Sequence, residues 1–230
     1  MAIKKTVIIS AGGSGQRMKS TLPKQFLPIG GVPVILRTID RFISALNDIE
    51  LIVVLNDKWK TLWQEICRKH SFDYPHTVIE GGAQRFHSVK NAIDYLVKEN
   101  TDEKLVAIHD AVRPFVSKDV ILNTFCEAER HGAAIVALPS TDSMRLKDQG
   151  DEWRAIDRQH IMTIQTPQVF LLSLLAKAYS QPFRPDFTDD ATVVETVNRK
   201  IRLVEGNREN FKITTPSDLL FAEALIKASF

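Results

Sequence analysis

Short hydrophobic runs alternate with longer amphipathic segments along the first 140 residues of the chain. Five runs are largely apolar and rich in β-branched residues, which is typical of strands buried on both faces; they cover 6–10, 51–56, 77–80, 105–109 and 133–138. Between them, apolar residues recur with a helical period over 34–46, 58–70, 85–98 and 118–131. This order predicts an α/β fold, a single Rossmann-like domain with a mostly parallel sheet flanked by helices, which binds ligands at the carboxyl ends of its strands.

The alternation stops at residue 139. Residues 139–163 are polar and contain a turn signal at 148–151, which predicts a projecting β-hairpin arm inserted into a domain that spans residues 1–230. After the arm, the pattern predicts helices over 171–180 and 188–198, a strand over 201–204 and a final helix. Thr215 is expected to cap that helix, with Pro216 at its first position.

Composition narrows the class of ligand. The chain of 230 residues has a net charge of +2, too small a basic surplus for non-specific nucleic-acid binding, so a small anionic ligand is favoured.

No run approaches the ~18 apolar residues of a membrane span, and the first apolar run is shorter than that of a signal peptide, so a cytoplasmic protein with no membrane contact is predicted. Cys67 and Cys126 show no metal-ligand spacing and are expected to be buried, reduced thiols, with no zinc site.

A glycine-rich segment follows the first strand directly. Gly13 and Gly15 match two glycines of the dinucleotide fingerprint, but the third is absent, and no Gly-Lys-Ser/Thr of a P-loop follows. The bare backbone of Gly12, Gly13 and Gly15 can still approach an anion closely, and Arg17 and Lys24 come next. The segment therefore predicts a triphosphate site; the alternative is a tight turn with surface charges.

Two further segments end on the same edge of the predicted sheet. Asp110 closes the fourth strand, where a carboxylate beside phosphates would hold Mg²⁺. Arg113 either faces that edge or forms an ordinary surface salt bridge. Gly82 and Ser88 follow the third strand, where small residues either admit a flat base against the backbone or simply form a strand-to-helix turn.

Short motifs spread over residues 6–226 resemble, in the same order, those of the 2-C-methyl-D-erythritol 4-phosphate cytidylyltransferase family. They are AGGSGQRM (11–18), PKQ (23–25), GG (81–82), HDAVRP (109–114), DSM (142–144), DR (157–158), TPQ (166–168), TDDA (188–191) and NFKIT (210–214). The resemblance implies a transferase that converts CTP and methylerythritol phosphate into CDP-methylerythritol and pyrophosphate, with Mg²⁺, in non-mevalonate isoprenoid synthesis. It also implies a homodimer in which the 139–163 arm reaches into the partner's site.

The resemblance also implies a role for each matching residue. The CTP phosphates and ribose would be surrounded by Ala11, Gly12, Gly13, Gly15, Arg17 and Lys24, and the cytosine by Gly82, Ala83 and Ser88. Within the substrate site, Asp110 would bind the metal and Lys212 the α-phosphate. The acceptor would be bound by Arg113, Thr166 and Thr188, together with Ser143 and Arg158 from the other subunit. Two positions depart from the pattern, since some members carry an acidic residue in place of Ala83 and threonine in place of Ser143.

The chemistry of such a reaction agrees with the residues. A phosphate monoester with a second pKa of about 6 is largely dianionic at neutral pH, so the nucleophile needs no general base. Repulsion between the two anions must instead be offset by cations, and Arg17, Lys24, Lys212 and Mg²⁺ on Asp110 are the catalytic candidates. In-line displacement at the α-phosphorus is the predicted mechanism.

Two alternatives stay open at this point. A ribitol-5-phosphate cytidylyltransferase shares similar segments, although the TDDA and DSM motifs favour methylerythritol phosphate. A non-catalytic nucleotide-binding module would not need both a metal carboxylate and a second anion site at Arg113, Thr188 and Arg158.

Overall fold

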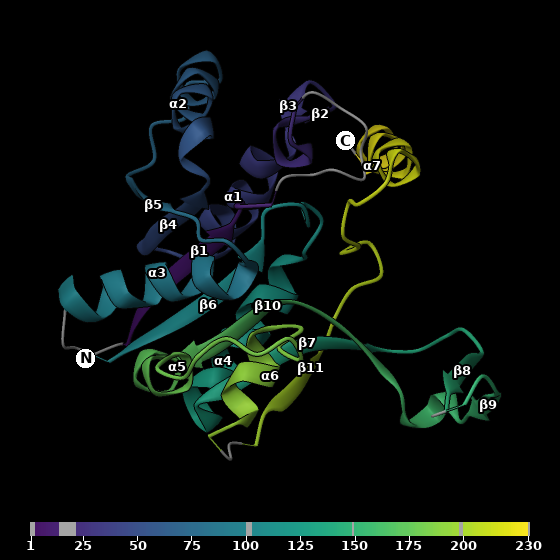
Figure 1. The fold of residues 1–230 in the computed structure, drawn as a ribbon. Helices are drawn as coiled ribbons and strands as arrows, with labels where there is room; N and C mark the ends of the chain where they lie inside the picture. Colours follow the sequence, from purple (N-terminus) through teal and green to yellow (C-terminus); the bar gives the residue numbers. More distant parts are fainter. Residues whose placement is uncertain (1–2, 14–21, 100–102, 149, 198–199, 230) are drawn as a thin grey trace.

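The computed structural model describes residues 3–13, 22–99, 103–148, 150–197 and 200–229. Within these residues, seven strands form one sheet in the order β11-β7-β10-β6-β1-β4-β5 (Figure 1). They are β1 (Lys4–Ser10), β4 (Ile49–Leu55), β5 (His76–Glu80), β6 (Lys104–Asp110), β7 (Ala133–Pro139), β10 (Met162–Leu171) and β11 (Arg202–Glu205).

The sheet is mostly parallel, as the sequence predicts. β1 pairs in parallel with β4 and β6, and β7 pairs in parallel with β11. Among the seven described strands of this sheet, β10 alone runs antiparallel to its neighbours, β6 and β7. The hydrophobic pattern did not predict β10, because a polar stretch with a proline, residues 165–168, interrupts its apolar residues.

Helices cover both faces of the sheet. Val7 and Ile9 of β1 pack with α1 (Val34–Ala45) and α4 (Lys118–His131), whereas Ile8 between them packs with α3 (Arg85–Glu99), α5 (Leu172–Tyr179) and α6 (Asp190–Glu195). This alternation follows from the two-residue period of a strand. α2 (Lys60–Lys69) adds Trp63 and Ile66 to the first cluster. The doubly covered sheet explains why its strands are apolar throughout.

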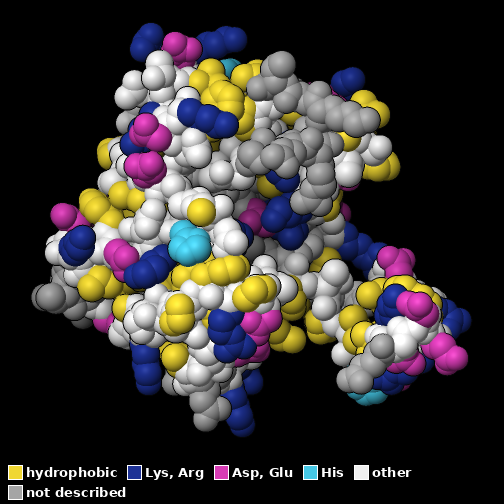
Figure 2. Space-filling model, viewed as in Figure 1, with side chains coloured by type: hydrophobic (Ala, Val, Ile, Leu, Met, Phe, Trp, Pro, Cys, Tyr) yellow, Lys and Arg dark blue, Asp and Glu magenta, His cyan; other side chains and the backbone are white. Residues whose placement is uncertain are grey.

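The arm extends β7 and β10 beyond the sheet. Its tip is the hairpin of β8 (Met144–Lys147) and β9 (Trp153–Ile156), which confirms the hairpin predicted within 139–163. Figures 1 and 2 show the tip standing apart from the body. Met144, Leu146 and Trp153 on the tip are 40%, 44% and 59% exposed, so its apolar side chains have little to pack against within this chain.

The remaining predictions of helices and of cysteine burial need two corrections. α7 (Pro216–Ser229) begins as predicted, and the Asp218 N–H donates to the Thr215 hydroxyl. The helix expected over 188–198 is shorter, because the Asp189 side chain caps it and α6 starts at Asp190. The cysteines are not both buried, since Cys126 is exposed and Cys67 is half-buried. None of the helices in the described ranges is long and apolar enough to cross a membrane.

Candidate active site

A cleft of about 610 Å³ opens at the carboxyl ends of β1, β4 and β6. Its walls come from the turn after β1 (10–13), a short 3-10 turn η2 (Lys24–Phe26), the turn after β5 (82–85) and the turn after β6 (110–112). Lys212 and Thr214 close it from the segment that leads to α7. This is the edge at which open α/β sheets bind their ligands.

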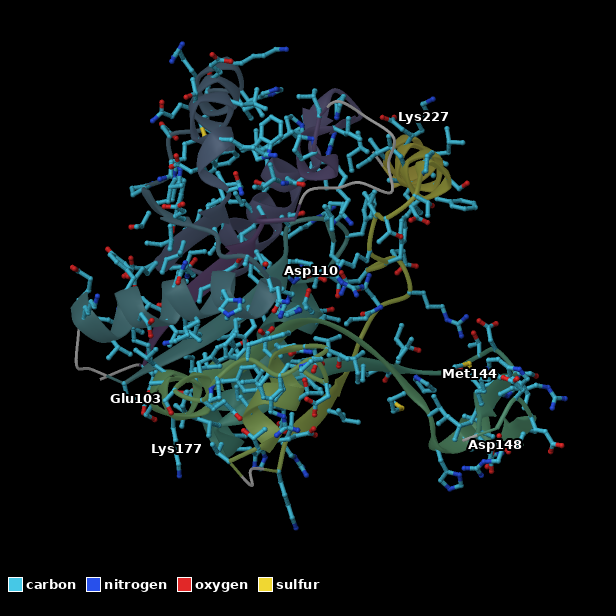
Figure 3. The ribbon with its side chains drawn as sticks, viewed as in Figure 1. Glu103, Asp110, Met144, Asp148, Lys177 and Lys227 are labelled. Atoms are coloured by element: carbon cyan, nitrogen blue, oxygen red, sulfur yellow. The ribbon has the colours of Figure 1, made fainter. Side chains whose placement is uncertain are left out.

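Asp110 lines the cleft, and Figure 3 labels it near the centre of the molecule. Among the described residues, three cationic side chains approach its carboxylate. Lys212 Nζ is 3.0 Å and Arg113 Nε 3.2 Å from Oδ2, and Arg85 Nε is 3.7 Å from Oδ1. Burial raises the pKa of Asp110, but Lys212, Arg85 and Arg113 outweigh burial and hold the pKa below its usual range. The carboxylate is therefore ionised, and positive charge exceeds negative charge around it.

Arg85 also binds a second, fully buried carboxylate. Its two terminal nitrogens each donate to one oxygen of Asp190 at 2.7 Å, and the Tyr179 hydroxyl donates to Asp190 Oδ1 at 2.6 Å. Burial alone would lower the pKa of Arg85, but the charge and hydrogen bonds of Asp190 outweigh burial and raise the pKa above its usual value. Arg85 thus joins the cleft to the first residue of α6. The sequence motifs did not indicate this connection.

A chain of hydrogen bonds fixes the backbone of Asp110. The Asp110 N–H donates to Thr166 Oγ1 at 3.1 Å, Thr166 Oγ1 is 3.0 Å from His109 Nδ1, and His109 Nε2 is 3.1 Å from the Arg113 carbonyl. A carbonyl only accepts, so Nε2 carries the proton and Nδ1 accepts from the Thr166 hydroxyl. Burial lowers the pKa of His109 to about 4, so the imidazole stays neutral at neutral pH.

The turn after β1 is fixed on two sides. The Ala11 N–H donates to the Val54 carbonyl at 3.0 Å, and the Gln25 side chain donates to the carbonyls of Ala11 and Gly13. Ala11, Gly12, Gly13 and Lys24, which are expected around the CTP phosphates and ribose, line the cleft. The predicted phosphate contacts of Gly15 and Arg17 fall outside the described residues.

Small residues pack tightly where the cytosine is expected. The Gly82 N–H donates to Ser88 Oγ at 3.0 Å. A Cβ at Gly12 or Gly81 would lie 3.1 or 3.2 Å from the same hydroxyl, and a Cβ at Gly82 would lie 2.3 Å from His87 Cβ. The segment is therefore a tight strand-to-helix turn that also forms a wall of the cleft, together with Ala83.

The residues expected at the acceptor lie in different places. Arg113 is largely buried, and its Nη1 donates to the Asn210 carbonyl at 2.7 Å, so its contact with Asp110 is not an ordinary surface salt bridge. Thr166 is buried beneath Asp110 and does not line the cleft, and Thr188 is exposed two residues before α6.

Ser143 and Arg158 are exposed on the arm, away from the cleft of their own chain. Arg158 Nη1 donates to the Thr141 carbonyl at 2.7 Å, inside the arm. Figure 3 labels Met144 and Asp148 far from Asp110, which shows how the arm is separated from the cleft. Of the residues that the structure describes, those expected at CTP thus line one cleft, whereas those expected at the acceptor lie apart.

The donor set bears on whether a metal fits. In the part of the chain that the structure describes, no three His, Cys, Asp or Glu side chains gather to hold a metal ion. Mg²⁺ is usually held by one or two carboxylates together with substrate phosphates. Asp110 on the cleft wall supplies one such carboxylate, and Arg85 Nε lies 3.7 Å from its Oδ1, beyond hydrogen-bond length.

Comparison with known proteins decides the family. Residues 5–228 match the family model of IspD, 2-C-methyl-D-erythritol 4-phosphate cytidylyltransferase. The chain belongs to this family. Proteins of the same name from Bacteroides fragilis and Bacteroides thetaiotaomicron are 47% and 45% identical, over 96% and 97% of this chain and 99% and 100% of theirs. The crystal structure of 4-diphosphocytidyl-2C-methyl-D-erythritol synthase from Anaerococcus prevotii superposes with a TM-score of 0.83 at 30% identity, covering 98% of this chain and 96% of that one.

The family membership confirms what the motifs implied about fold and class. The chain is an enzyme, a cytidylyltransferase of the nucleotidyltransferase class, and its sheet is that of IspD structures. The matches favour neither the ribitol-5-phosphate enzyme nor a non-catalytic module.

Proposed function

We propose that the cleft joins CTP to 2-C-methyl-D-erythritol 4-phosphate, giving CDP-methylerythritol and pyrophosphate in non-mevalonate isoprenoid synthesis. The observation that carries the proposal is the ionised Asp110 carboxylate with Lys212, Arg113 and Arg85 around it, beside a glycine turn. Such a cluster suits a site that must hold several phosphate groups and one metal ion. The family's name supports both substrates.

CTP would occupy the cleft from the glycine turn to the turn after β5. Ala11, Gly12 and Gly13 present backbone to the phosphates, and Lys24 adds a positive charge on the same wall. Arg17 and Gly15 are proposed to complete the phosphate site. Gly82, Ala83 and Ser88 form the wall for the base, where compact residues leave room for a flat ring.

The reaction is proposed to be an in-line displacement. An oxygen of the acceptor's dianionic phosphate attacks the α-phosphorus of CTP, and the bond from that phosphorus to the pyrophosphate oxygen breaks. Lys212 and Lys24 would stabilise the negative charge that gathers on the α-phosphoryl oxygens and on pyrophosphate. No general base is required, and His109 does not serve as one, because its Nδ1 already accepts from Thr166.

Mg²⁺ would be held by Asp110 together with the phosphates of CTP. When bound, it neutralises phosphate charge and polarises the phosphoryl oxygens. The chain's own part is to keep Asp110 ionised and fixed. The cations around Asp110 keep it ionised, and the hydrogen bond from its N–H to Thr166 keeps it in place.

The acceptor is proposed to bind near Arg113 and Thr188 of one subunit and Ser143 and Arg158 of another, while Thr166, buried beneath Asp110, supports that carboxylate and does not touch the acceptor. Both arm residues lie away from the cleft of their own chain, and the arm exposes apolar side chains that a second subunit would cover. A symmetric dimer would complete both sites at once. We propose a homodimer on these grounds; a cytoplasmic location stays a prediction of the sequence.

Single lysine variants test the proposal. Lys24→Ala and Lys212→Ala should each lower kcat for CDP-methylerythritol formation about 10²-fold or more, by analogy with the loss of one positioned oxyanion donor. Lys90→Ala is the matched control, because Lys90 pairs with Asp94 on α3 and does not line the cleft. If both cleft variants turn over like the control while folded, the proposed phosphate site is wrong.

A further inference from the structure

Gln25 is a polar side chain buried at the edge of the cleft. Only 2% of it is exposed, and its amide nitrogen Nε2 lies 2.7 Å from the Ala11 carbonyl oxygen and 3.3 Å from that of Gly13. An amide NH₂ carries two donors, so Gln25 has one for each carbonyl. One side chain therefore holds alternate peptide groups of the glycine turn.

These two bonds set the direction of the peptide groups. A trans peptide is planar, and its C=O and N–H point in opposite directions. Because the Ala11 carbonyl points at Gln25, the N–H of Gly12 points away from Gln25. The amide thus draws the electronegative carbonyl oxygens to one side of the turn and leaves an N–H on the other. An anion is attracted by N–H groups and repelled by carbonyl oxygens.

Gln25 also belongs to the turn that carries Lys24. The η2 turn is closed by the Phe26 N–H, which donates to the Pro23 carbonyl at 2.9 Å. Phe26 is buried and its ring meets Trp59 edge-on, with centroids 6.1 Å apart. The turn is therefore anchored in the core by Phe26 and against the glycine turn by Gln25. Lys24, next in the chain to Gln25, is brought to the cleft wall by the same anchors.

We propose that Gln25 is a positioning residue for CTP, which holds the glycine turn with its N–H side toward the triphosphate and fixes Lys24 beside it. The proposal rests on the proposed function of the cleft, since it assigns the triphosphate to this turn. Gln25 acts through the turn and not by touching the nucleotide.

The test compares Gln25→Met, which keeps the length and loses the donors, with Gln25→Glu, which replaces the donors by acceptors. With Gln25→Met, KM for CTP should rise about tenfold or more, as when one net hydrogen bond is lost, and kcat should fall. Inhibition by pyrophosphate should weaken by the same factor, while KM for methylerythritol phosphate stays within about twofold, since the acceptor does not meet the turn.

Protonation gives Gln25→Glu a readout of its own. Burial raises the pKa of a carboxyl group, and a protonated carboxyl again offers one donor. In this variant KM for CTP should therefore fall as the pH is lowered from about 8 to about 5.5, relative to the wild type at each pH. A residue that only stabilises the fold would show no such recovery.

Gln181→Met is the matched control. The Gln181 amide also donates to a backbone carbonyl, that of Ala178 at 2.6 Å, but it does not line the cleft. This variant should keep the wild-type KM for CTP, and all proteins are assayed at a temperature where thermal unfolding shows them folded. Wild-type KM values for CTP in Gln25→Met, or the absence of a pH-dependent recovery in Gln25→Glu, would overturn the inference. If the wild type itself releases no pyrophosphate from CTP, the proposed function fails instead.

Discussion

His109 should make the stability of the fold depend on pH. Its ring is fully buried and donates to the Arg113 carbonyl while accepting from Thr166, so the folded protein holds the neutral form. Replacing His109 with glutamine keeps a polar amide and removes the titrating group. The two proteins should therefore lose stability differently on acidification.

The size of the effect follows from the two pKa values. An unfolded chain has the ordinary histidine pKa near 6.5, whereas burial lowers the pKa of folded His109 to about 4. Between these values the unfolded chain binds the extra proton, so the free energy of unfolding falls as the pH falls. The contribution of neutral His109 to the free energy of unfolding is complete above about pH 6.5 and is lost as the pH falls toward about 4. Each pH unit is worth about 1.4 kcal/mol, which gives a loss of about 2 kcal/mol between pH 7 and pH 5.

Urea denaturation of the wild type and of His109→Gln at pH 7, 6 and 5 measures this loss. The wild type should lose about 2 kcal/mol more than the variant over that range. Changes in carboxylate protonation are common to both proteins and cancel in the comparison. His160→Gln, which removes an exposed imidazole on the arm, should follow the wild type. If the free energy of unfolding falls equally with pH in the wild type and in His109→Gln, His109 is not held neutral in the folded protein.

Three further predictions concern the metal, the buried ion pair and the dimer. Asp110→Asn should lower activity and weaken its response to added Mg²⁺, because an amide is a poorer ligand for a hard cation; an unchanged Mg²⁺ titration would contradict this. Asp190→Asn should cost about 3 kcal/mol or more in urea unfolding, because Arg85 loses the buried carboxylate that binds both of its terminal nitrogens, whereas Tyr179→Phe should cost only about 1 kcal/mol. Lys24→Ala and Arg158→Ala, each inactive alone, should recover activity when mixed and allowed to exchange subunits, because a heterodimer contains one site free of both changes. No recovery after demonstrated exchange would show that Arg158 serves no partner site.

The sequence predicted most of the sheet because burial on both faces leaves a clear mark on a strand. The strand ends then located Asp110, since the last residue of a parallel strand must reach the ligand edge. Strand β10 escaped prediction because residues 165–168 are polar and include a proline. Those polar residues are explained by the site, where Thr166 supports Asp110 and Gln168 donates to Asp189.

Residues that act through long-range pairing could not be predicted from the sequence. Arg85 and Asp190 are separated by 105 positions, and neither the helical period nor a local motif marks their contact. Gln25 lies in a motif that the family resemblance includes, yet its bond to Ala11 depends on how two turns meet in space. The charge of the site was predictable, but the groups that orient it were not.

An acceptor assay identifies the second substrate of the enzyme directly. In the presence of Mg²⁺, pyrophosphate release from CTP is measured with 2-C-methyl-D-erythritol 4-phosphate and, in parallel, with ribitol 5-phosphate at the same concentration. The cytidine-containing product is identified by mass spectrometry. We predict pyrophosphate and CDP-methylerythritol with the first acceptor and little pyrophosphate release with the second. A preference for ribitol 5-phosphate, or no release with either, would contradict this prediction.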